Sequence, residues 1–187
     1  KVLALPRNKA TWLSTQTRNW LSGLGVESNS KAIMLWHKGH VVFEEYFNGA
    51  DATTLVISRS LSKPMSVIAV GRAIQQGFIR DLDVPASVYL KEWRGTDKAQ
   101  ITLRHLLQMR SGLAPQGYTP DPKDVMNRAY LHPFHIEVIL HEYPLVSEPG
   151  TRYDYSNANS EIIAPIIERA TGPRYSEWIT ESVPVPL

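Results

Sequence analysis

Two serine–lysine pairs lie at a spacing that permits acyl chemistry, Ser60 with Lys63 and Ser28 with Lys31. Residues three apart share one face of a helix, so the two side chains of such a pair can touch. A lysine in the first turn of a helix lies near the positive end of the helix dipole, which favours the neutral amine. A neutral amine can accept the serine proton, and the serine oxygen can then attack a carbonyl carbon.

The surroundings of the two pairs differ. Ser60 begins a predicted helix that ends at Gly77, and Pro64 lies in its first turns, where a missing N–H does least damage. Ser28 lies in a polar stretch that we interpret as a solvated loop. This spacing also arises by chance, so a capping serine and a surface lysine stay open as the alternative reading of Ser60 and Lys63. The predicted apolar face consists of Met65, Ile68, Ala69, Ala73 and Ile74.

A tyrosine and an asparagine two residues apart form a second candidate motif, and it also occurs twice. A tyrosine beside a lysine can relay protons, and an amide can orient both the lysine and a substrate. Tyr46 and Asn48 follow a predicted strand, where an aromatic residue usually packs. Tyr155 and Asn157 lie in a turn before a predicted helix, which is a better place for a catalytic group.

Hydrophobic periodicity and turn residues predict one hairpin and several helices around these motifs. Thr102 is expected to cap one helix and Gly112 to end it. The segment 114–149 holds six of the thirteen prolines and is predicted to be a partly helical excursion that forms a pocket wall. The hairpin is predicted over 32–47, with Gly39 in its turn, and the helices over 12–24, 60–77, 83–93, 103–110, 159–170 and 175–180.

Composition excludes several classes of function. The 187 residues are 43% hydrophobic and 20% charged, which is typical of a globular domain. A net charge of +2 without a basic cluster argues against nucleic-acid binding, and no apolar run is long enough for a membrane span. The absence of cysteine excludes disulfides, cysteine zinc sites and thiol catalysis. The compartment stays open, with the periplasm or secretion favoured over the cytoplasm.

Other polar and aromatic residues give weaker signals. His132, His135, His141 and Glu142 contain metal-ligating groups, but no HExxH helix is present and Pro133 breaks the local periodicity. We therefore predict surface or pocket-lining roles for them and no metal site. The five tryptophans are expected to be core or half-buried anchors. No glycine-rich nucleotide loop is present, so no cofactor is predicted.

Three segments resemble the serine β-lactamase-related family, which spans class C β-lactamases, DD-peptidases and esterases. Residues 55–77 (LVISRSLSKPMSVIAVGRAIQQG) resemble its nucleophile helix, and residues 101–113 (ITLRHLLQMRSGL) the helix and turn downstream. Residues 148–172 (EPGTRYDYSNANSEIIAPIIERATG) resemble the segment with the catalytic tyrosine. Residues 118–126 (YTPDPKDVM) and the YSN triplet are similar to the esterase and 6-aminohexanoate-dimer hydrolase branch.

The resemblance implies roles for individual residues. Ser60 is the expected acylated nucleophile, Lys63 its partner and Tyr155 the general base. Asn157 is expected to orient the substrate and the lysine, and Tyr118 is a candidate lining residue of the substrate pocket. The backbone N–H of Ser60 is expected to be one oxyanion donor. The family requires no metal or organic cofactor.

The resemblance, which covers about 32–187, also implies a fold class. We expect an α+β, β-lactamase/transpeptidase-like fold in which a helical cluster packs on an antiparallel sheet. Residues 1–187 are expected to be the N-terminal portion of a single domain that lacks the C-terminal strands and the family's third motif. The missing C-terminal portion is thus an expected partner, and the isolated chain is expected to be nearly inactive.

The sequence as a whole predicts a serine hydrolase that cleaves a small-molecule carboxylic ester or amide through an acyl-enzyme. Two alternatives stay open. One is a DD-peptidase or β-lactamase that acts on peptidoglycan or β-lactams. The other is a non-catalytic binding module that uses the same pocket.

Overall fold

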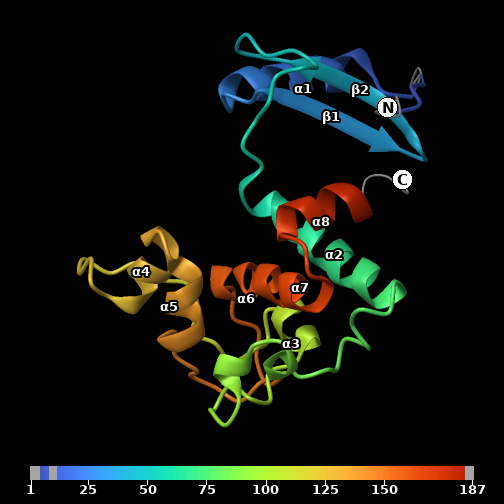
Figure 1. Ribbon diagram of the computed structural model, residues 1–187. Coiled ribbons are helices and arrows are strands. Elements are labelled where there is room, and N and C mark those ends of the chain that lie inside the picture. The colour runs from blue at the N-terminus through green and yellow to red at the C-terminus, as the bar shows by residue number, and fades with distance from the viewer. Residues whose placement is uncertain (1–4, 9–11, 184–187) are drawn as a thin grey trace. The chain divides into compact units, whose positions relative to one another are not determined.

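A computed structural model describes residues 5–8 and 12–183 of the chain. The chain divides into two compact units, Lys1–Ser58 and Arg59–Leu187 (Figure 1). In the part of the chain that the structure describes, the first unit contains one helix and a β-hairpin, whereas the second is built from helices and loops. No helix among the described residues is long and apolar enough to cross a membrane.

The first unit is built on the predicted hairpin. Strands β1 (Ala32–His37) and β2 (His40–Tyr46) pair antiparallel, with a bulge at Leu35/Trp36. Lys38 and Gly39 both have positive φ angles, as a tight two-residue hairpin turn requires. The hairpin prediction is therefore confirmed.

Helix α1 (Thr15–Glu27) accompanies the hairpin in the first unit. It begins three residues later than the periodicity predicts, because the Ser14 side chain caps it by accepting from the Thr17 N–H. Gly25 lies so close to the Phe47 ring that a Cβ there would stand 2.3 Å from a ring carbon. A side chain at this position would therefore require the Phe47 ring to move.

The tryptophans follow the prediction in the second unit and depart from it in the first. Trp93 and Trp178 are buried. Trp12, Trp20 and Trp36 are exposed in the first unit, where the small hydrophobic cluster is formed by Leu13, Val42 and Phe43 instead. A helix and two strands enclose too little volume to bury three indole rings as well.

The second unit gathers its helices around one hydrophobic core. Helix α7 packs against both α2 and α8, and α4 packs against α5. The Trp93 indole N–H donates to the Leu140 carbonyl at 3.1 Å, so the largest core side chain has its polar atom satisfied. The elements are η1 (Arg59–Ser62), α2 (Lys63–Gln75), η2 (Ala86–Val88), η3 (Lys91–Trp93), α3 (Leu103–Leu107), α4 (Val125–Leu131), α5 (His135–His141), α6 (Asn157–Glu161), α7 (Ile163–Thr171) and α8 (Tyr175–Ser182).

The predicted 60–77 helix begins as the 3-10 turn η1 and becomes α-helical only at Lys63. Three further predicted helices differ from the observed ones. The predicted 83–93 helix is replaced by η2 and η3, because the fully buried Leu90 has a non-helical backbone between them. The predicted 159–170 helix is divided into α6 and α7 at Ile162. The cause is Pro165 in the first turn of α7, which has no N–H to donate to the Glu161 carbonyl four residues earlier. Helix α3 ends at Leu107, since Met109 is left-handed, while the predicted Thr102 cap is confirmed.

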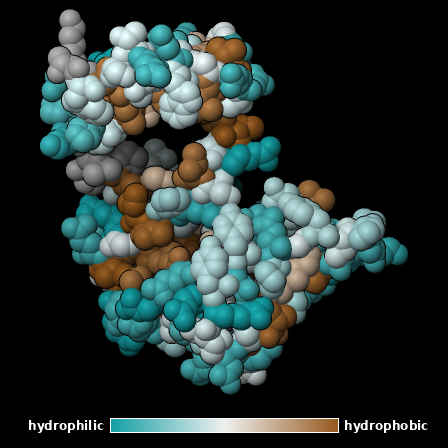
Figure 2. Space-filling view, turned by 180° about the vertical axis from the view of Figure 1, so that it is seen from behind, coloured by the Kyte–Doolittle hydropathy of each residue, from teal (hydrophilic) through white to brown (hydrophobic). Residues whose placement is uncertain are grey.

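Helix α2 shows where periodicity misjudges burial. Ala69 and Ala73 are fully buried, as predicted, but Ile68 is exposed together with its neighbour Val67. Figure 2 shows apolar patches on the surface of this unit. Apolar residues of α2 therefore lie on its exposed side as well as on the side that packs against the core.

Backbone hydrogen bonds join the loop after α3 to the segment that precedes α6. The Gly150 N–H donates to the Arg110 carbonyl at 2.7 Å, and the Asp154 N–H donates to the Met109 carbonyl at 2.9 Å. The Gln116 N–H donates to the Tyr155 carbonyl at 2.9 Å. These bonds fix the backbone on which Tyr155 is carried.

The junction between these two segments requires a glycine at position 112, and replacing Gly112 tests this requirement. It has a φ of 81°, and a Cβ there would lie 2.0 Å from the Ser147 carbonyl oxygen. We expect Gly112→Ala to lower the free energy of unfolding by about 3 kcal/mol, from left-handed strain plus a backbone clash. Gly77→Ala is the matched control, because Gly77 has the same φ of 81° and nothing within 4 Å.

The control should cost only about 1 kcal/mol, the left-handed strain alone. Urea unfolding of both variants measures the difference. Equal losses for the two substitutions would contradict the proposed clash at Ser147.

Candidate active site

The backbone around Ser60 is held in an unusual conformation. Arg59, the residue before it, is left-handed with a φ of 51°. The Ser62 hydroxyl donates back to the Arg59 carbonyl at 2.7 Å, which stabilises this conformation. A non-glycine residue in this region costs energy and commonly marks a functional site. Ser60 thus lies in a short 3-10 turn, one turn before α2 begins at Lys63.

Lys63 connects the nucleophile candidate to the second motif. Its Nζ donates to Ser60 Oγ at 3.1 Å, which confirms the predicted contact. It also donates to Asn157 Oδ1 at 2.7 Å, at the start of α6. The amide oxygen therefore lies where it can orient the lysine beside the serine oxygen, which is the role that the resemblance implies for Asn157.

Tyr155 completes the cluster. Its hydroxyl lies 2.8 Å from Ser60 Oγ, and Lys63 Nζ lies 5.3 Å from its ring centroid. The hydrogen bond with Ser60, followed by that with Lys63, lowers the pKa of Tyr155 below the usual value for tyrosine. A tyrosine that ionises more easily can accept the proton of Ser60, so the geometry permits the predicted base.

Ser156, between Tyr155 and Asn157, anchors the motif to the interior of the unit, and no feature of the sequence pattern indicated this. Its side chain is fully buried, and its Oγ lies 3.0 Å from the Tyr143 hydroxyl. The Tyr143 hydroxyl in turn donates to the Ala114 carbonyl at 3.1 Å. Because Ser156 points into the unit, its neighbours Tyr155 and Asn157 are directed towards Ser60 and Lys63.

The duplicate serine–lysine pair does not form such a contact. The Ser28 hydroxyl donates to the Leu24 carbonyl at 2.6 Å, and Lys31 Nζ donates to the Asn48 carbonyl at 3.0 Å. Each side chain therefore satisfies a backbone carbonyl in the first unit. This agrees with the interpretation of Ser28 as a solvated loop residue.

The duplicate tyrosine also differs in its electrostatics. The Tyr46 hydroxyl donates to the Glu44 carboxylate, and this hydrogen bond raises the pKa of Tyr46. Tyr155, in contrast, has a serine and an ammonium beside it, and its pKa is lowered. The two tyrosines match the same motif, but only Tyr155 has the surroundings of a base.

A cavity of about 610 Å³ opens beside Ser60 and Lys63. Tyr130 and His135 from the predicted pocket wall line it, whereas Tyr118 does not. The Tyr118 ring meets Tyr130 edge-to-face at 5.6 Å and lines a separate cavity of about 550 Å³. Sequence reasoning missed several lining residues, namely Arg59, Ser66, Glu161 and Tyr175.

The structure offers no metal site among the residues that it describes, since no three ligating side chains cluster there. His135 Nε2 lies 3.5 Å from a Glu161 oxygen, and His141 Nε2 lies 3.4 Å from a Glu137 oxygen. Glu142 is paired with Arg128. The histidines of the pocket wall are thus distributed over separate pairs.

Comparison with known proteins identifies the family. The Beta-lactamase family matches residues 25–187, so the chain belongs to the Beta-lactamase family. Its fold is β-lactamase/transpeptidase-like, with a small antiparallel sheet and many helices. Similar proteins in the family are hydrolases or acyltransferases.

Three relatives illustrate the similarity. Acyltransferase mokF from Monascus pilosus is 28% identical over 146 residues, which are 68% of this chain and 35% of that protein. A Bacillus anthracis structure assigned as a 6-aminohexanoate-dimer hydrolase is 25% identical, with a TM-score of 0.76 over 97% of this chain and 52% of that one. EstCE1, a hydrolase with promiscuous acyltransferase activity, is 22% identical, with a TM-score of 0.70 over 91% of this chain and 51% of that one.

The chain therefore spans about half the length of these solved structures and about a third of that acyltransferase.

The hydrogen bond to Ser60 gives a direct test of the Tyr155 environment. Because this bond is the largest cause of the lowered pKa, Ser60→Ala should raise the pKa of Tyr155. Carbon-13 tyrosine NMR across a pH titration measures it. Ser66→Ala is the control, since the Ser66 hydroxyl lies 3.3 Å from the Tyr175 hydroxyl instead. An unchanged Tyr155 titration in Ser60→Ala would show that the two hydroxyls do not meet.

Proposed function

We propose that this protein is a serine hydrolase that cleaves a carboxylic ester or amide through an acyl-enzyme on Ser60. The observation that supports this best is the joint contact of three side chains. Ser60 Oγ lies 2.8 Å from the Tyr155 hydroxyl and 3.1 Å from Lys63 Nζ. A nucleophile, a base and a cation within hydrogen-bonding distance are the parts that acyl transfer needs.

The proposed acylation begins with Tyr155 as the phenolate. Its oxygen takes the proton of Ser60, and Ser60 Oγ forms a bond to the carbonyl carbon of the substrate. The tetrahedral intermediate then expels the alcohol or amine, which leaves with the proton from Tyr155. The acyl group stays on Ser60, and Tyr155 is a phenolate again.

Lys63 and Asn157 support this step by electrostatics. The Lys63 ammonium stabilises the phenolate, and Asn157 Oδ1 keeps Nζ in place at 2.7 Å. The Ser60 N–H is proposed as one donor to the oxyanion. In the second half-reaction a water or an alcohol attacks the acyl carbonyl while Tyr155 removes its proton. The bond between the acyl carbon and Ser60 Oγ then breaks, Ser60 Oγ takes the proton from Tyr155, and the acid or new ester leaves.

The identity of the acyl acceptor decides between hydrolysis and transfer. A cavity of about 610 Å³ has room for an acyl group and an acceptor of moderate size. The similarity to an acyltransferase and to a hydrolase with promiscuous acyltransferase activity supports both outcomes. We therefore propose that water is the default acceptor and that an alcohol can replace it.

Covalent labelling tests the nucleophile. Intact mass after treatment with a fluorophosphonate should show one adduct, and Ser60→Ala should abolish it. Tyr155→Phe should slow labelling by about a hundredfold or more, the usual contribution of a general base. Ser28→Ala is the matched control, because it removes the duplicate serine, and it should label normally. An adduct that persists in Ser60→Ala would refute the assignment.

Substrate preference separates the proposed activity from its rivals. With the expected C-terminal portion present, a p-nitrophenyl ester should turn over faster than a β-lactam of similar size, and an added alcohol should divert part of the acyl group to a new ester. Product analysis by mass spectrometry measures the division. A β-lactam preference would favour the β-lactamase or DD-peptidase alternative, and ligand binding without any turnover would favour the binding module.

A further inference from the structure

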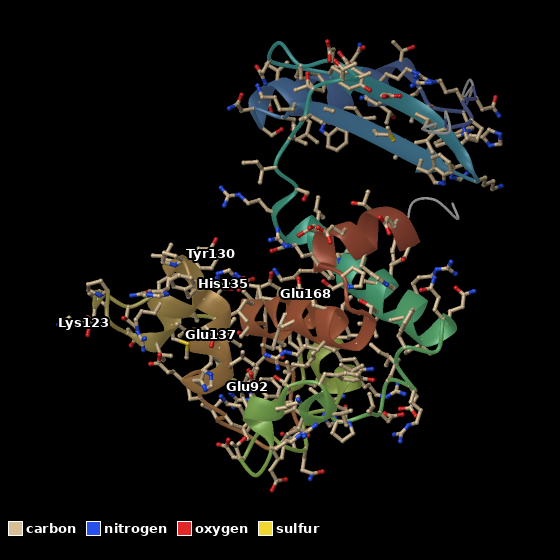
Figure 3. The ribbon with its side chains drawn as sticks, viewed as in Figure 1. Glu92, Lys123, Tyr130, His135, Glu137 and Glu168 are labelled. Carbon is tan, nitrogen blue, oxygen red and sulfur yellow. The ribbon has the colours of Figure 1, made fainter. Side chains whose placement is uncertain are left out.

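A second cavity of the helical unit is distinct from that beside Ser60, although Lys63 lines both. Its volume is about 410 Å³, and it lies against α2, α6 and the end of α3, so we call it the α2–α3 cavity. Figure 3 shows Tyr130 on α4 and His135 on α5, which line the Ser60 cavity and not this one. A mostly apolar cavity of this size is typical of a small-molecule site. Its apolar lining residues are Pro64, Val67, Ile68, Leu106, Leu107 and Met109.

The exposure of the lining residues gives the α2–α3 cavity a direction. Val67 and Ile68 on α2 are 49% and 46% exposed, so they form its mouth. Leu106 and Asn159 are buried and form its floor. A ligand that enters this cavity therefore keeps one end on the open side of α2 and brings the other end to α6.

Asn159 on this floor has an unpaired side-chain amide. The residue is only 1% exposed, and neither its Oδ1 nor its Nδ2 forms a hydrogen bond with any residue that the structure describes. Buried polar groups are nearly always hydrogen-bonded, and leaving both ends of an amide unpaired costs free energy. A partner that both donates and accepts at this point would therefore gain more than it does in water.

The other polar side chains that line the α2–α3 cavity already have partners. Lys63 is engaged with the catalytic cluster. The Ser66 hydroxyl lies 3.3 Å from the Tyr175 hydroxyl, and the Ser160 hydroxyl donates to the Asn157 carbonyl at 3.0 Å. Among the described residues that line this cavity, the amide on the floor is thus the polar side chain left for a ligand.

We propose that the α2–α3 cavity binds a small apolar primary carboxamide whose amide pairs with that of Asn159. The Asn159 side chain offers an acceptor at Oδ1 and donors at Nδ2, and a primary carboxamide offers the same two groups in complementary positions. Two parallel hydrogen bonds then satisfy both atoms, while the chain of the ligand packs on Val67 and Ile68. A ketone or a carboxylate only accepts and an ammonium only donates, so each of these would leave one end of the amide unpaired.

Two ligands of the same shape test the amide pairing. Heptan-2-one has a methyl group where hexanamide has its NH₂ group, so the ketone only accepts hydrogen bonds. Calorimetry in a Ser60→Ala background, with the expected C-terminal portion present, compares the two without any turnover. Hexanamide should bind about tenfold tighter than heptan-2-one, because it alone satisfies both ends of the Asn159 amide. Equal affinities, or no binding of hexanamide, would refute the proposal.

Replacing the asparagine tests its part in the preference. Asn159→Leu keeps the size of the side chain and removes two unpaired atoms from the interior, so the variant should fold at least as stably, which thermal unfolding measures. It should bind hexanamide no tighter than heptan-2-one. A preference for hexanamide that persists in Asn159→Leu would overturn the proposal.

A pair of exposed valines tests the location. Val67→Trp places an indole at the mouth of the α2–α3 cavity and should weaken hexanamide binding at least tenfold. Val88→Trp is the matched control, since Val88 is 48% exposed in η2 and does not line the cavity, and it should bind normally. Undiminished binding in Val67→Trp would place the ligand elsewhere and contradict the proposal. None of these measurements requires Ser60, so they decide the role of the cavity whether or not the proposed acyl chemistry holds.

Discussion

The hydrogen bond between Lys63 Nζ and Asn157 Oδ1 is the interaction on which the site depends. It joins the first residue of α2 to the first residue of α6, which lie 94 positions apart in the chain. Without it the ammonium group would have no fixed position, and the serine oxygen at 3.1 Å would lose an oriented donor. Backbone hydrogen bonds between the loop after α3 and the segment before α6 support this contact, because they place Asn157 where Lys63 can reach it.

The site combines a strained backbone at Arg59 with surrounding polar side chains that are hydrogen-bonded. Arg59 adopts a left-handed backbone, and the Ser62 hydroxyl stabilises it locally. Ser156 is buried but bonded to Tyr143, so the motif is anchored at little cost. These contacts are formed by residues that never touch a substrate. They fix the reacting groups before any ligand arrives, which is the condition for electrostatic stabilisation of a transition state.

Charge in the cavity is distributed unevenly. The ammonium of Lys63 is shared between Ser60 and Asn157, while Glu161 Oε2 at the end of α6 lies 3.5 Å from His135 Nε2 and accepts no hydrogen bond from the residues that the structure describes. Tyr155 and Tyr46 show that such surroundings set the direction of a pKa shift, because a serine and a lysine lower the pKa of Tyr155 whereas a glutamate raises that of Tyr46. Environment, rather than motif, therefore decides which side chain can act as a base.

The sequence by itself determined the local features of this protein. Turn residues and periodicity predicted the hairpin, the Thr102 cap and the α2 segment, because these depend on neighbours within a few residues. Order and spacing of three segments pointed to the family and to Ser60, Lys63, Tyr155 and Asn157. Local surroundings also favoured each motif over its duplicate, and the tertiary structure added the contacts, since Ser28 and Tyr46 have partners other than a catalytic cluster. The anchoring of Ser156 and the positions of Glu161 and Tyr118 likewise depend on packing between distant segments, and one-dimensional spacing does not encode such packing.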